Sequence, residues 1–353
     1  MAPFTPLHDP GQRSFASDNC AGTHPQVLEA MVAANGGHQP SYGDDVYTDR
    51  LRELIRHHFG ENAQAYPVFN GTGANVVSLQ AMTDRWESVI CAKSSHLNTD
   101  ECGAAERMAG IKLIPIESPD GKLRAEAIME EAFGWDNPHR AAPRVVSLTQ
   151  TTELGTCYTP DELVTISERA HNVGMRVHVD GARLANAAST LGLGFQEFTT
   201  EVGIDVVSFG GTKNGLVLGE VVVVLDPTAV RGLDHLRKSS MQLSSKMRFV
   251  SCQLVALLED GLWLESARHA NAMARRLAET LTGVEGVSIS RPVEANAVFA
   301  VLDPAVTSVL QSKFHFYVWD DETGEVRWMT AFDTTEDDID EFAAAVISAT
   351  GDL

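Results

Sequence analysis

Residues 175–215 read MRVHVDGARLANAASTLGLGFQEFTTEVGIDVVSFGGTKNG, and this stretch decides the fold. An apolar run that contains Val177 and Val179 ends at Asp180, and a second apolar run ends in a glycine turn before Lys213. The strand–helix–strand pattern predicts a βαβ unit in a parallel sheet. Ligands of such sheets bind at the carboxyl ends of the strands, where Asp180 and Lys213 both fall.

An aspartate and a lysine at neighbouring strand ends suit one type of cofactor. A lysine amine condenses with an aldehyde, and a carboxylate keeps a basic ring nitrogen protonated, which is how proteins bind pyridoxal 5′-phosphate. Two other interpretations fit the residues taken singly: Lys213 as a solvated loop residue and Asp180 as a helix N-cap. Because Arg183 falls at the same sheet edge, the joint pattern favours the cofactor.

Composition and charge narrow the function further. The 353 residues predict two domains with ample core. The 27 basic and 48 acidic residues give a formal charge of −21, which argues against nucleic-acid and anionic-membrane partners. Five scattered cysteines without a CxxC pair support neither a disulfide framework nor a metal site. We therefore expect a cytoplasmic protein that acts on a small molecule.

Other segments predict the surroundings of this edge. The sequence from Asn70 to Asn75, NGTGAN, follows a short strand and opens a helix, so its amides form a plausible phosphate cradle. His96 follows the next strand, and residues 97–110 are expected to form one helix. Residues 215–225 predict a strand at the border of the large sheet. The sequence pattern changes after residue 226. Residues 231–253 carry a cluster of basic side chains, which is either a solvated helix face or a phosphate contact.

Eight segments in a fixed order carry a resemblance to a known family. Taken together they resemble the threonine aldolase family, of the low-specificity L-threonine aldolase type, within the β-eliminating-lyase group of fold-type-I pyridoxal phosphate enzymes. The resemblance runs from about residue 15 to about residue 340. The segments are FASDN, SYGDDVYTDRL, FNGTGANV, HLNTDECGAAERMAG, VHVDGARLANA, FGGTKNG, KMR at 246–248 and VRWMTAFDTTEDDI.

The resemblance implies a fold and an assembly. It implies a large α/β domain (residues 13–250) with a mainly parallel seven-stranded sheet, and a small C-terminal α+β domain (residues 251–353). It also implies a homotetramer or a dimer whose sites are shared between subunits.

The same resemblance implies roles for single residues. Lys213 would form the Schiff base with the cofactor aldehyde, Asp180 would pair with the ring nitrogen, and His96 would stack on the ring. The resemblance assigns the remaining positions to three groups: phosphate contacts Gly71, Thr72 and, from a neighbouring subunit, Arg248; carboxylate contacts Ser17, Arg183 and Arg327; and Glu101 in the segment that borders the site.

The chain departs from the family pattern near the substrate. Many members have a histidine in an ENTHNG-like segment, and Glu153 stands at that position here. Ala16, Asp100 and residues 244–246 depart as well, which concerns stereochemistry and substrate range. The base for the substrate hydroxyl is His96, directly or through a water, or Glu153.

The implied reaction is reversible cleavage of β-hydroxy-α-amino acids such as threonine or allo-threonine, and phenylserine-type substrates are compatible with it. Other pyridoxal phosphate reactions, namely β-elimination, transamination or decarboxylation, share the lysine and the aspartate. A non-catalytic binding protein on the same fold is the remaining alternative.

Overall fold

Alternating apolar side chains along the central strands place one hydrophobic core on each face of a seven-stranded sheet. The computed structural model describes residues 5–351. In β7, Val221 and Val223 join the core on one face, while Val222 and Val224 join the core on the other. This period of two is what a strand buried on both faces requires.

The large sheet has the order β1-β7-β6-β5-β4-β2-β3. Only β7 runs antiparallel to its neighbours, and the other pairs in this sheet are parallel. The strands are β1 (Gln64–Val68), β2 (Glu87–Ala92), β3 (Lys112–Ile116), β4 (Ala142–Thr149), β5 (Arg176–Gly181), β6 (Val206–Gly210) and β7 (Glu220–Val224). The predicted mainly parallel seven-stranded sheet is confirmed.

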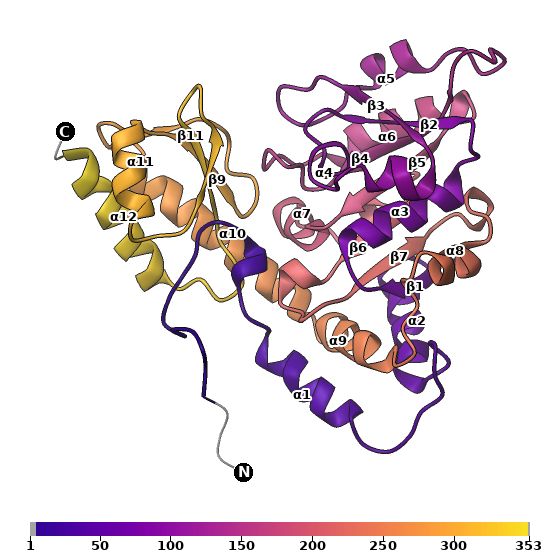
Figure 1. Cartoon of the computed structure of the whole chain (residues 1–353), viewed down its shortest axis with the longest axis horizontal. Helices are drawn as coiled ribbons and strands as arrows, with labels where there is room; N and C mark the ends of the chain where they lie inside the picture. The colour runs from indigo at the N-terminus through magenta and orange to yellow at the C-terminus, as the bar shows by residue number, and fades with distance from the viewer. Residues whose placement is uncertain (1–4, 352–353) are drawn as a thin grey trace.

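Helices cover both faces of this sheet (Figure 1). The core on one face includes α3 (Gly71–Met82) and α8 (Leu233–Ser239). The core on the other face takes its helical residues from α1 (Pro25–Ala34), α2 (Val46–Phe59), α5 (Ala125–Glu131), α6 (Pro160–Asn172), α7 (Leu184–Leu191), α9 (Arg248–Leu258) and the start of α10 (Leu262–Leu281).

Two sequence predictions about these elements were wrong. Residues 97–110 do not form one helix: α4 (His96–Thr99) is separated from a π-helical turn, η2 (Ala105–Ala109), by Cys102 and Gly103 in the left-handed region. The strand expected at the border of the sheet is β7, which lies between β1 and β6. The return of the chain through a turn after β6 puts β7 next to β6, and β1 then takes the edge.

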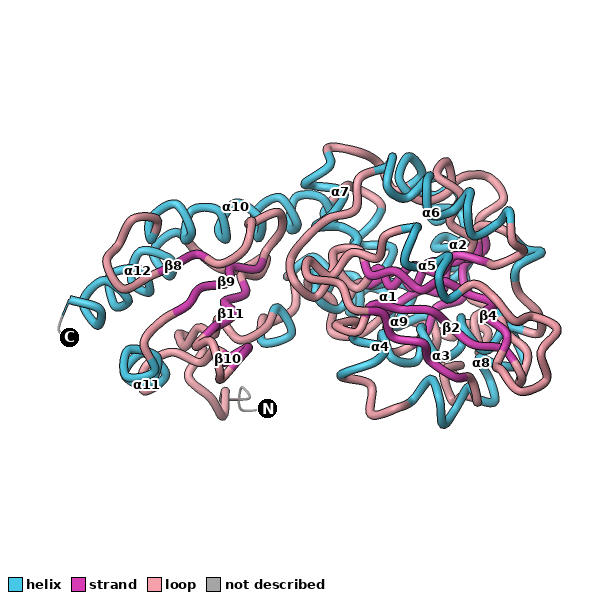
Figure 2. The backbone as a smooth tube through the Cα atoms, turned by 90° about the horizontal axis from the view of Figure 1, so that it is seen from above, coloured by secondary structure: helices cyan, strands magenta, loops and turns pink. Residues whose placement is uncertain are grey.

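A second, antiparallel sheet builds the small C-terminal layer (Figure 2). Its order is β10-β11-β9-β8, and α10, α11 and α12 contribute to its core. The elements are β8 (Ser288–Ile289), β9 (Ala297–Val301), α11 (Pro304–Gln311), β10 (Tyr317–Asp320), β11 (Glu325–Met329) and α12 (Glu336–Gly351).

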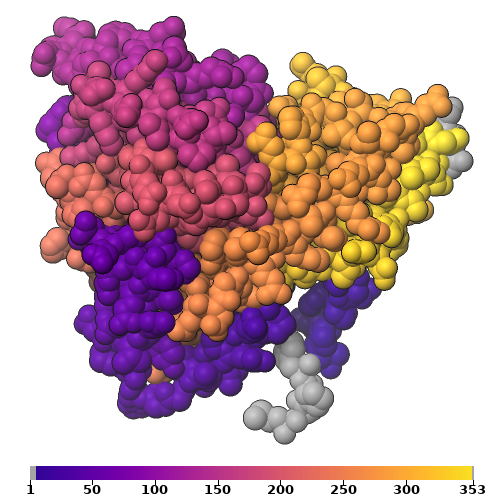
Figure 3. All heavy atoms as spheres, turned by 180° about the vertical axis from the view of Figure 1, so that it is seen from behind, coloured from indigo at the N-terminus to yellow at the C-terminus, as the bar shows by residue number. Residues whose placement is uncertain are grey.

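The N-terminal segment and α10 connect the two parts. Phe15 stacks on Phe342 of α12 with ring centroids 4.2 Å apart, so the N-terminal segment enters the small core. Trp263 of α10 belongs to the large core and Leu277 to the small one. In Figure 3 the indigo N-terminal helices lie beside orange residues, in agreement with the contacts that α1 and α2 make with α9. The predicted division into 13–250 and 251–353 stays a prediction; its boundary falls inside α9, whose buried side chains pack in the large core.

Within residues 5–351, the helices are too short or too polar to cross a bilayer. The same residues hold no group of three or more His, Cys, Asp or Glu side chains arranged to bind a metal ion. All five cysteines are free thiols.

Candidate active site

A cavity of about 670 Å³ opens where the central strands end, and β10 and β11 of the small sheet form its opposite wall. Two layers that are far apart in sequence therefore enclose one site. The predicted site residues that line this cavity are Ser17, Gly71, Thr72, His96, Glu101, Glu153, Asp180, Arg183, Lys213 and Arg327.

Lys213 lies in a short 3-10 turn, Thr212–Asn214, directly after β6. Glycine at position 210 allows this strand end to approach the turn after Asp180: a Cβ atom there would lie 2.6 Å from the carbonyl oxygen of Ala182. Burial lowers the pKa of the Lys213 ammonium, and repulsion by Arg183 adds to the effect. A lowered pKa favours the neutral, nucleophilic amine that an aldehyde requires.

Asp180 lies at the end of β5 and is 7% exposed. Its Oδ1 accepts a hydrogen bond of 3.0 Å from the backbone N–H of Ala182, and its Oδ2 accepts one of 2.8 Å from Nδ2 of Asn75. Asn75 also donates a 2.8 Å hydrogen bond to Oε1 of Glu101, so one amide joins two carboxylates. Sequence reasoning missed Asn75, although it lies in the NGTGAN segment.

His96, the first residue of α4, pairs with Glu101, which follows this helix. Nδ1 of His96 lies 3.0 Å from Oε1 of Glu101, and because a carboxylate accepts, Nδ1 carries the proton. This hydrogen bond raises the pKa of His96. The imidazole is 40% exposed, so its ring remains open to the cavity.

Glu153 follows β4 and lies beside the same histidine. Its Oε1 accepts a 2.7 Å hydrogen bond from the backbone N–H of His96, while its buried Oε2 has no partner. Burial raises the pKa of Glu153, and the nearby charge of Asp180 acts in the same direction. The carboxyl is thus anchored through one oxygen and has a second oxygen to offer a ligand.

The start of α3 supplies an anion site. Asn70 caps the helix by accepting a 2.7 Å hydrogen bond from the N–H of Gly73, and Gly71 and Thr72 open the first turn at the cavity wall. The helix dipole and free amides favour a phosphate at such a position. The amide group of Gln242 lies so close to Gly73 that it would have to shift if residue 73 carried a Cβ atom.

Two arginines line the cavity, and they differ in how far their guanidinium groups are hydrogen-bonded. Arg183 donates from Nε and Nη2 to Asp18 at 2.7 and 2.9 Å, so part of its fork is already occupied. Arg327 stands 4.6 Å above the Trp319 ring, and its buried Nε has no partner. Burial lowers the pKa of Arg327 to about 10, together with repulsion from Arg183. A carboxylate ligand would relieve this desolvated guanidinium.

Arg248 does not line the cavity of the single chain. It lies at the start of α9, where Nη1 donates to the carbonyl of Gly37 at 3.3 Å and the guanidinium stands 4.9 Å from the Phe249 ring. Its predicted contact with the phosphate would have to come from another subunit, and it stays a prediction. In the same basic cluster, Arg231 pairs with Asp84 at 2.7 Å.

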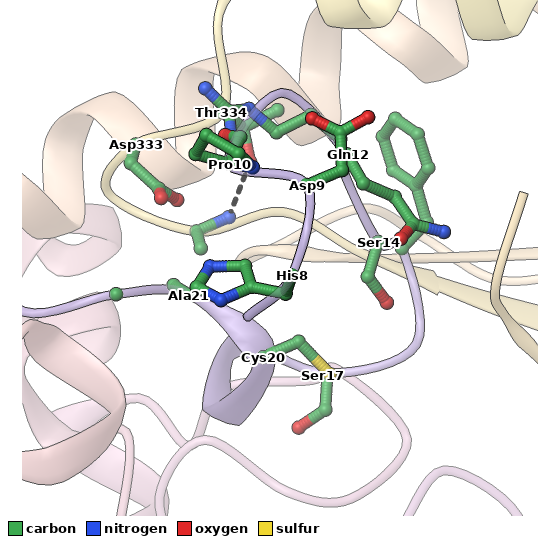
Figure 4. Close-up of a pocket in the computed structure, with 14 residues that line it drawn as sticks. His8, Asp9, Pro10, Gln12, Ser14, Ser17, Cys20, Ala21, Asp333 and Thr334 are labelled. Carbon is green, nitrogen blue, oxygen red and sulfur yellow. Dashed lines mark hydrogen bonds between the residues drawn. The ribbon is translucent and has the colours of Figure 1, made fainter. Parts of the chain in front are cut away.

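A second, smaller cavity of about 300 Å³ lies on the other side of Ser17 (Figure 4). His8 and Asp9 of the N-terminal segment face Asp333 and Thr334 of the small layer there. Apart from Ser17, it contains none of the predicted site residues.

The residues around the cavity fit one type of cofactor. A buried amine, a carboxylate at the next strand end, an open histidine ring and an anion cradle surround one cavity. The amine suits an aldehyde, the carboxylate suits a basic ring nitrogen, the histidine ring suits an aromatic face, and the anion cradle suits a phosphate. Pyridoxal 5′-phosphate carries all four groups. Fold and site together define a fold-type-I enzyme that depends on pyridoxal 5′-phosphate.

Comparisons with known proteins agree. The family model described as Beta-eliminating lyase matches residues 14–305. The chain is 42% identical over 342 residues to the low specificity L-threonine aldolase of Pseudomonas sp. (strain NCIMB 10558), which covers 96% of this chain and 99% of that one. It is 41% identical to the Pseudomonas aeruginosa protein of the same name, over 94% and 96% of the two chains.

A solved structure gives the same result. The threonine aldolase of Leishmania major superposes with a TM-score of 0.90 at 29% identity, over 96% of this chain and 99% of that one. The chain belongs to the beta-eliminating lyase family and is similar along its length to threonine aldolases. It is therefore a lyase, and its cofactor is pyridoxal 5′-phosphate.

Proposed function

We propose that this enzyme cleaves L-threonine, L-allo-threonine and related β-hydroxy-α-amino acids, phenylserine-type substrates included, to glycine and an aldehyde. The observation that carries the proposal is the meeting of Lys213, Asp180 and the incompletely paired Arg327 in one cavity. The names of the Pseudomonas relatives support the reaction.

The cofactor supplies one thing when bound: it withdraws electrons from the α-carbon of the substrate. The chain's own residues hold it there. We assign Lys213 to its aldehyde, Asp180 to its ring nitrogen, His96 to its ring face, and the amides of Gly71 and Thr72 to its phosphate. Asn75 and Glu101 fix Asp180 and His96 through hydrogen bonds and so act as positioning residues.

The carboxylate of the substrate binds on the side of the small sheet. Arg327 offers it an unpaired guanidinium edge, and Arg183, whose fork Asp18 occupies in part, lines the same cavity. The Ser17 hydroxyl borders this position. With the carboxylate fixed, rotation about the α-carbon is restricted, and this selects which bond is cleaved.

Glu153 accepts the proton of the substrate β-hydroxyl in this proposal. Its carboxyl is anchored through one oxygen, and burial raises its pKa toward the neutral range that suits a general base. His96 is the second candidate: its Nδ1 donates to Glu101, which leaves Nε2 as the nitrogen that can accept a proton. As the proton leaves, the Cα–Cβ bond breaks and the hydroxyl carbon becomes the aldehyde.

The assembly belongs to the proposal as well. We place the enzyme in the cytoplasm as a homotetramer in which Arg248 reaches the phosphate of a neighbouring subunit. Exposed apolar side chains such as Val32 (77%) and Met241 (70%) support a surface that another subunit covers. Light scattering of the wild type tests the assembly, and a cofactor titration of Arg248→Ala tests the phosphate contact. A monomeric wild type would contradict the first point, and full cofactor affinity in the variant would contradict the second.

Product analysis separates this function from its rivals. Incubation with L-threonine should release glycine and acetaldehyde in equal amounts. Release of 2-oxobutanoate would indicate β-elimination, conversion of an added 2-oxo acid to its amino acid would indicate transamination, and release of carbon dioxide would indicate decarboxylation. Cofactor binding without any product would favour the non-catalytic protein. A panel of threonine, allo-threonine, phenylserine and serine stereoisomers then defines the preferred substrate.

A further inference from the structure

A buried carboxyl beside Lys213 has no role in the account above. Glu220 opens β7, is 6% exposed, and lines the same cavity as the lysine. Nothing in the sequence marks it, because a glutamate before four valines reads as the outer end of a buried strand. Its position follows from register: Glu220 stands opposite Gly210, the last residue of β6.

Glu220 closes the loop that carries Lys213. The loop leaves β6 at Gly210 and returns at Glu220, whose Oε2 accepts a 2.8 Å hydrogen bond from the N–H of Gly211. The Thr212 hydroxyl accepts the N–H of Gly219, the residue before Glu220, at 3.3 Å. Two hydrogen bonds, Gly211 to Glu220 and Gly219 to Thr212, therefore hold the base of the loop.

The charges around this carboxyl are few. Among residues 5–351, no lysine, arginine or histidine nitrogen lies within 4.0 Å of Glu220. Lys213 and Asp180 are the charged groups that act on it, the first by attraction and the second by repulsion. Burial, the largest effect, and repulsion by Arg183 lower the pKa of Lys213. Attraction by Asp18, Asp180 and Glu220 acts in the opposite direction. Because burial raises the pKa of Glu220 to about 7, its carboxyl is mainly ionised above that pH. In the ionised form it favours a positive charge at the lysine nitrogen.

We infer that Glu220 is a positioning residue for Lys213: it fixes the loop that carries the lysine, and its negative charge stabilises the protonated state of the lysine nitrogen. The inference rests on the proposed role of Lys213. It concerns the protonation of the Lys213 nitrogen, both in the cofactor-free protein and after the cofactor is attached. It requires no further reactant, because the proton exchanges with water.

The test is a pH titration of absorbance in the cofactor-loaded protein, which follows protonation at the Lys213 nitrogen without measuring turnover. Glu220→Gln keeps an oxygen that can accept the Gly211 N–H but removes the charge. Loss of one nearby charge should lower the titration midpoint by about one pH unit. Glu220→Asp keeps the charge and should titrate closer to the wild type than Glu220→Gln does.

Asp205→Asn is the matched control. Asp205 is also buried, at 5% exposure, and its Oδ2 also accepts a backbone N–H, that of Val177 at 2.6 Å. It precedes β6 and so lies at the opposite end of that strand from Lys213. Asp205→Asn should leave the midpoint unchanged.

Equal midpoints for the wild type, Glu220→Gln and Asp205→Asn would overturn the inference while leaving the cofactor assignment intact. Equal shifts in Glu220→Gln and Glu220→Asp would overturn it too, because packing rather than charge would then be the cause. If Glu220→Gln takes up no cofactor, the pH dependence of Lys213 acetylation in the cofactor-free protein gives the same comparison. A wild type that never attaches cofactor to Lys213 would instead refute the proposed function.

Discussion

The Asp18 carboxylate binds the Arg183 guanidinium through two hydrogen bonds, of 2.7 and 2.9 Å, with side chains that are 1% and 13% exposed. The two residues are 165 positions apart in sequence. Asn296 of the small layer donates to the same carboxylate at 3.0 Å. One ion pair therefore joins the N-terminal segment, the large sheet and the small layer at the wall of the active site.

Removal of this carboxylate should destabilise the protein and weaken substrate binding. Asp18→Ala leaves Arg183 buried without its partner, and breaking a buried pair from one side costs about 3–5 kcal/mol. Urea unfolding at neutral pH measures the loss, and a raised KM for threonine should accompany it. Asp49→Ala is the control, since the Arg52–Asp49 pair is exposed and should contribute about 1 kcal/mol or less. Equal losses in both variants would contradict the prediction.

Substitution of Arg327 should act on substrate binding alone. Arg327→Lys keeps a positive charge but loses the planar fork that a carboxylate binds through two hydrogen bonds. The loss of about 1.5–3 kcal/mol corresponds to a KM for threonine raised roughly 10- to 100-fold, with cofactor affinity unchanged. Steady-state kinetics and an absorbance titration with cofactor measure the two quantities. Arg124→Lys, at a surface position, serves as control; an unchanged KM in Arg327→Lys would remove Arg327 from the carboxylate site.

Two variants separate the candidates for the base. Glu153→Gln keeps the oxygen that accepts the His96 N–H but cannot take a proton, so kcat should fall by about 100-fold or more. His96→Phe keeps an aromatic face and should lose about tenfold or less in kcat if the imidazole is not the base. Stopped-flow detection of aldehyde release measures both. The reverse order of losses would assign the proton to His96.

Glu220 should also impose a pH dependence on stability. Burial raises its pKa from 4.5 to about 7, so the folded protein binds this proton more tightly than the unfolded chain. The resulting stability is fully present below pH 4.5 and is lost as the pH rises through about 7. Glu220→Gln lacks this loss, and the free energy of unfolding of the variant should gain on the wild type by about 3 kcal/mol between pH 4.5 and pH 8. Urea unfolding of the cofactor-free proteins across this range checks the sign, and a difference that is constant with pH would refute it.

Local patterns in the sequence predicted much of the fold and the positions of Asp180, Lys213 and the NGTGAN segment, whereas the other site residues came from the family resemblance. The apolar runs before Asp180 and Lys213 fix two strand ends, and parallel packing brings strand ends to one edge. Lys213 and Asp180 could thus be placed near each other from sequence, whereas the role of His96 was implied by the resemblance. Arg327 was identified by resemblance, since a hairpin residue alone says nothing of a ligand.

The missed residues depend on tertiary register rather than on local pattern. Asn75 faces inward only because α3 lies across the sheet, and Glu220 meets the lysine loop only because β7 returns beside β6. The Asp18 carboxylate lies in a turn whose partner is 165 residues away. The break after α4 depends on left-handed backbone at Cys102, a residue type that gives no signal for it.

The most direct measurement of the central claim is the site of cofactor attachment. The cofactor-loaded protein is reduced with borohydride, digested and analysed by peptide mass spectrometry, with Lys213→Ala treated in parallel. The account predicts a stable pyridoxyl adduct on Lys213 in the wild type and none in the variant. An adduct on another lysine that persists in Lys213→Ala, or no adduct in the wild type, would contradict it.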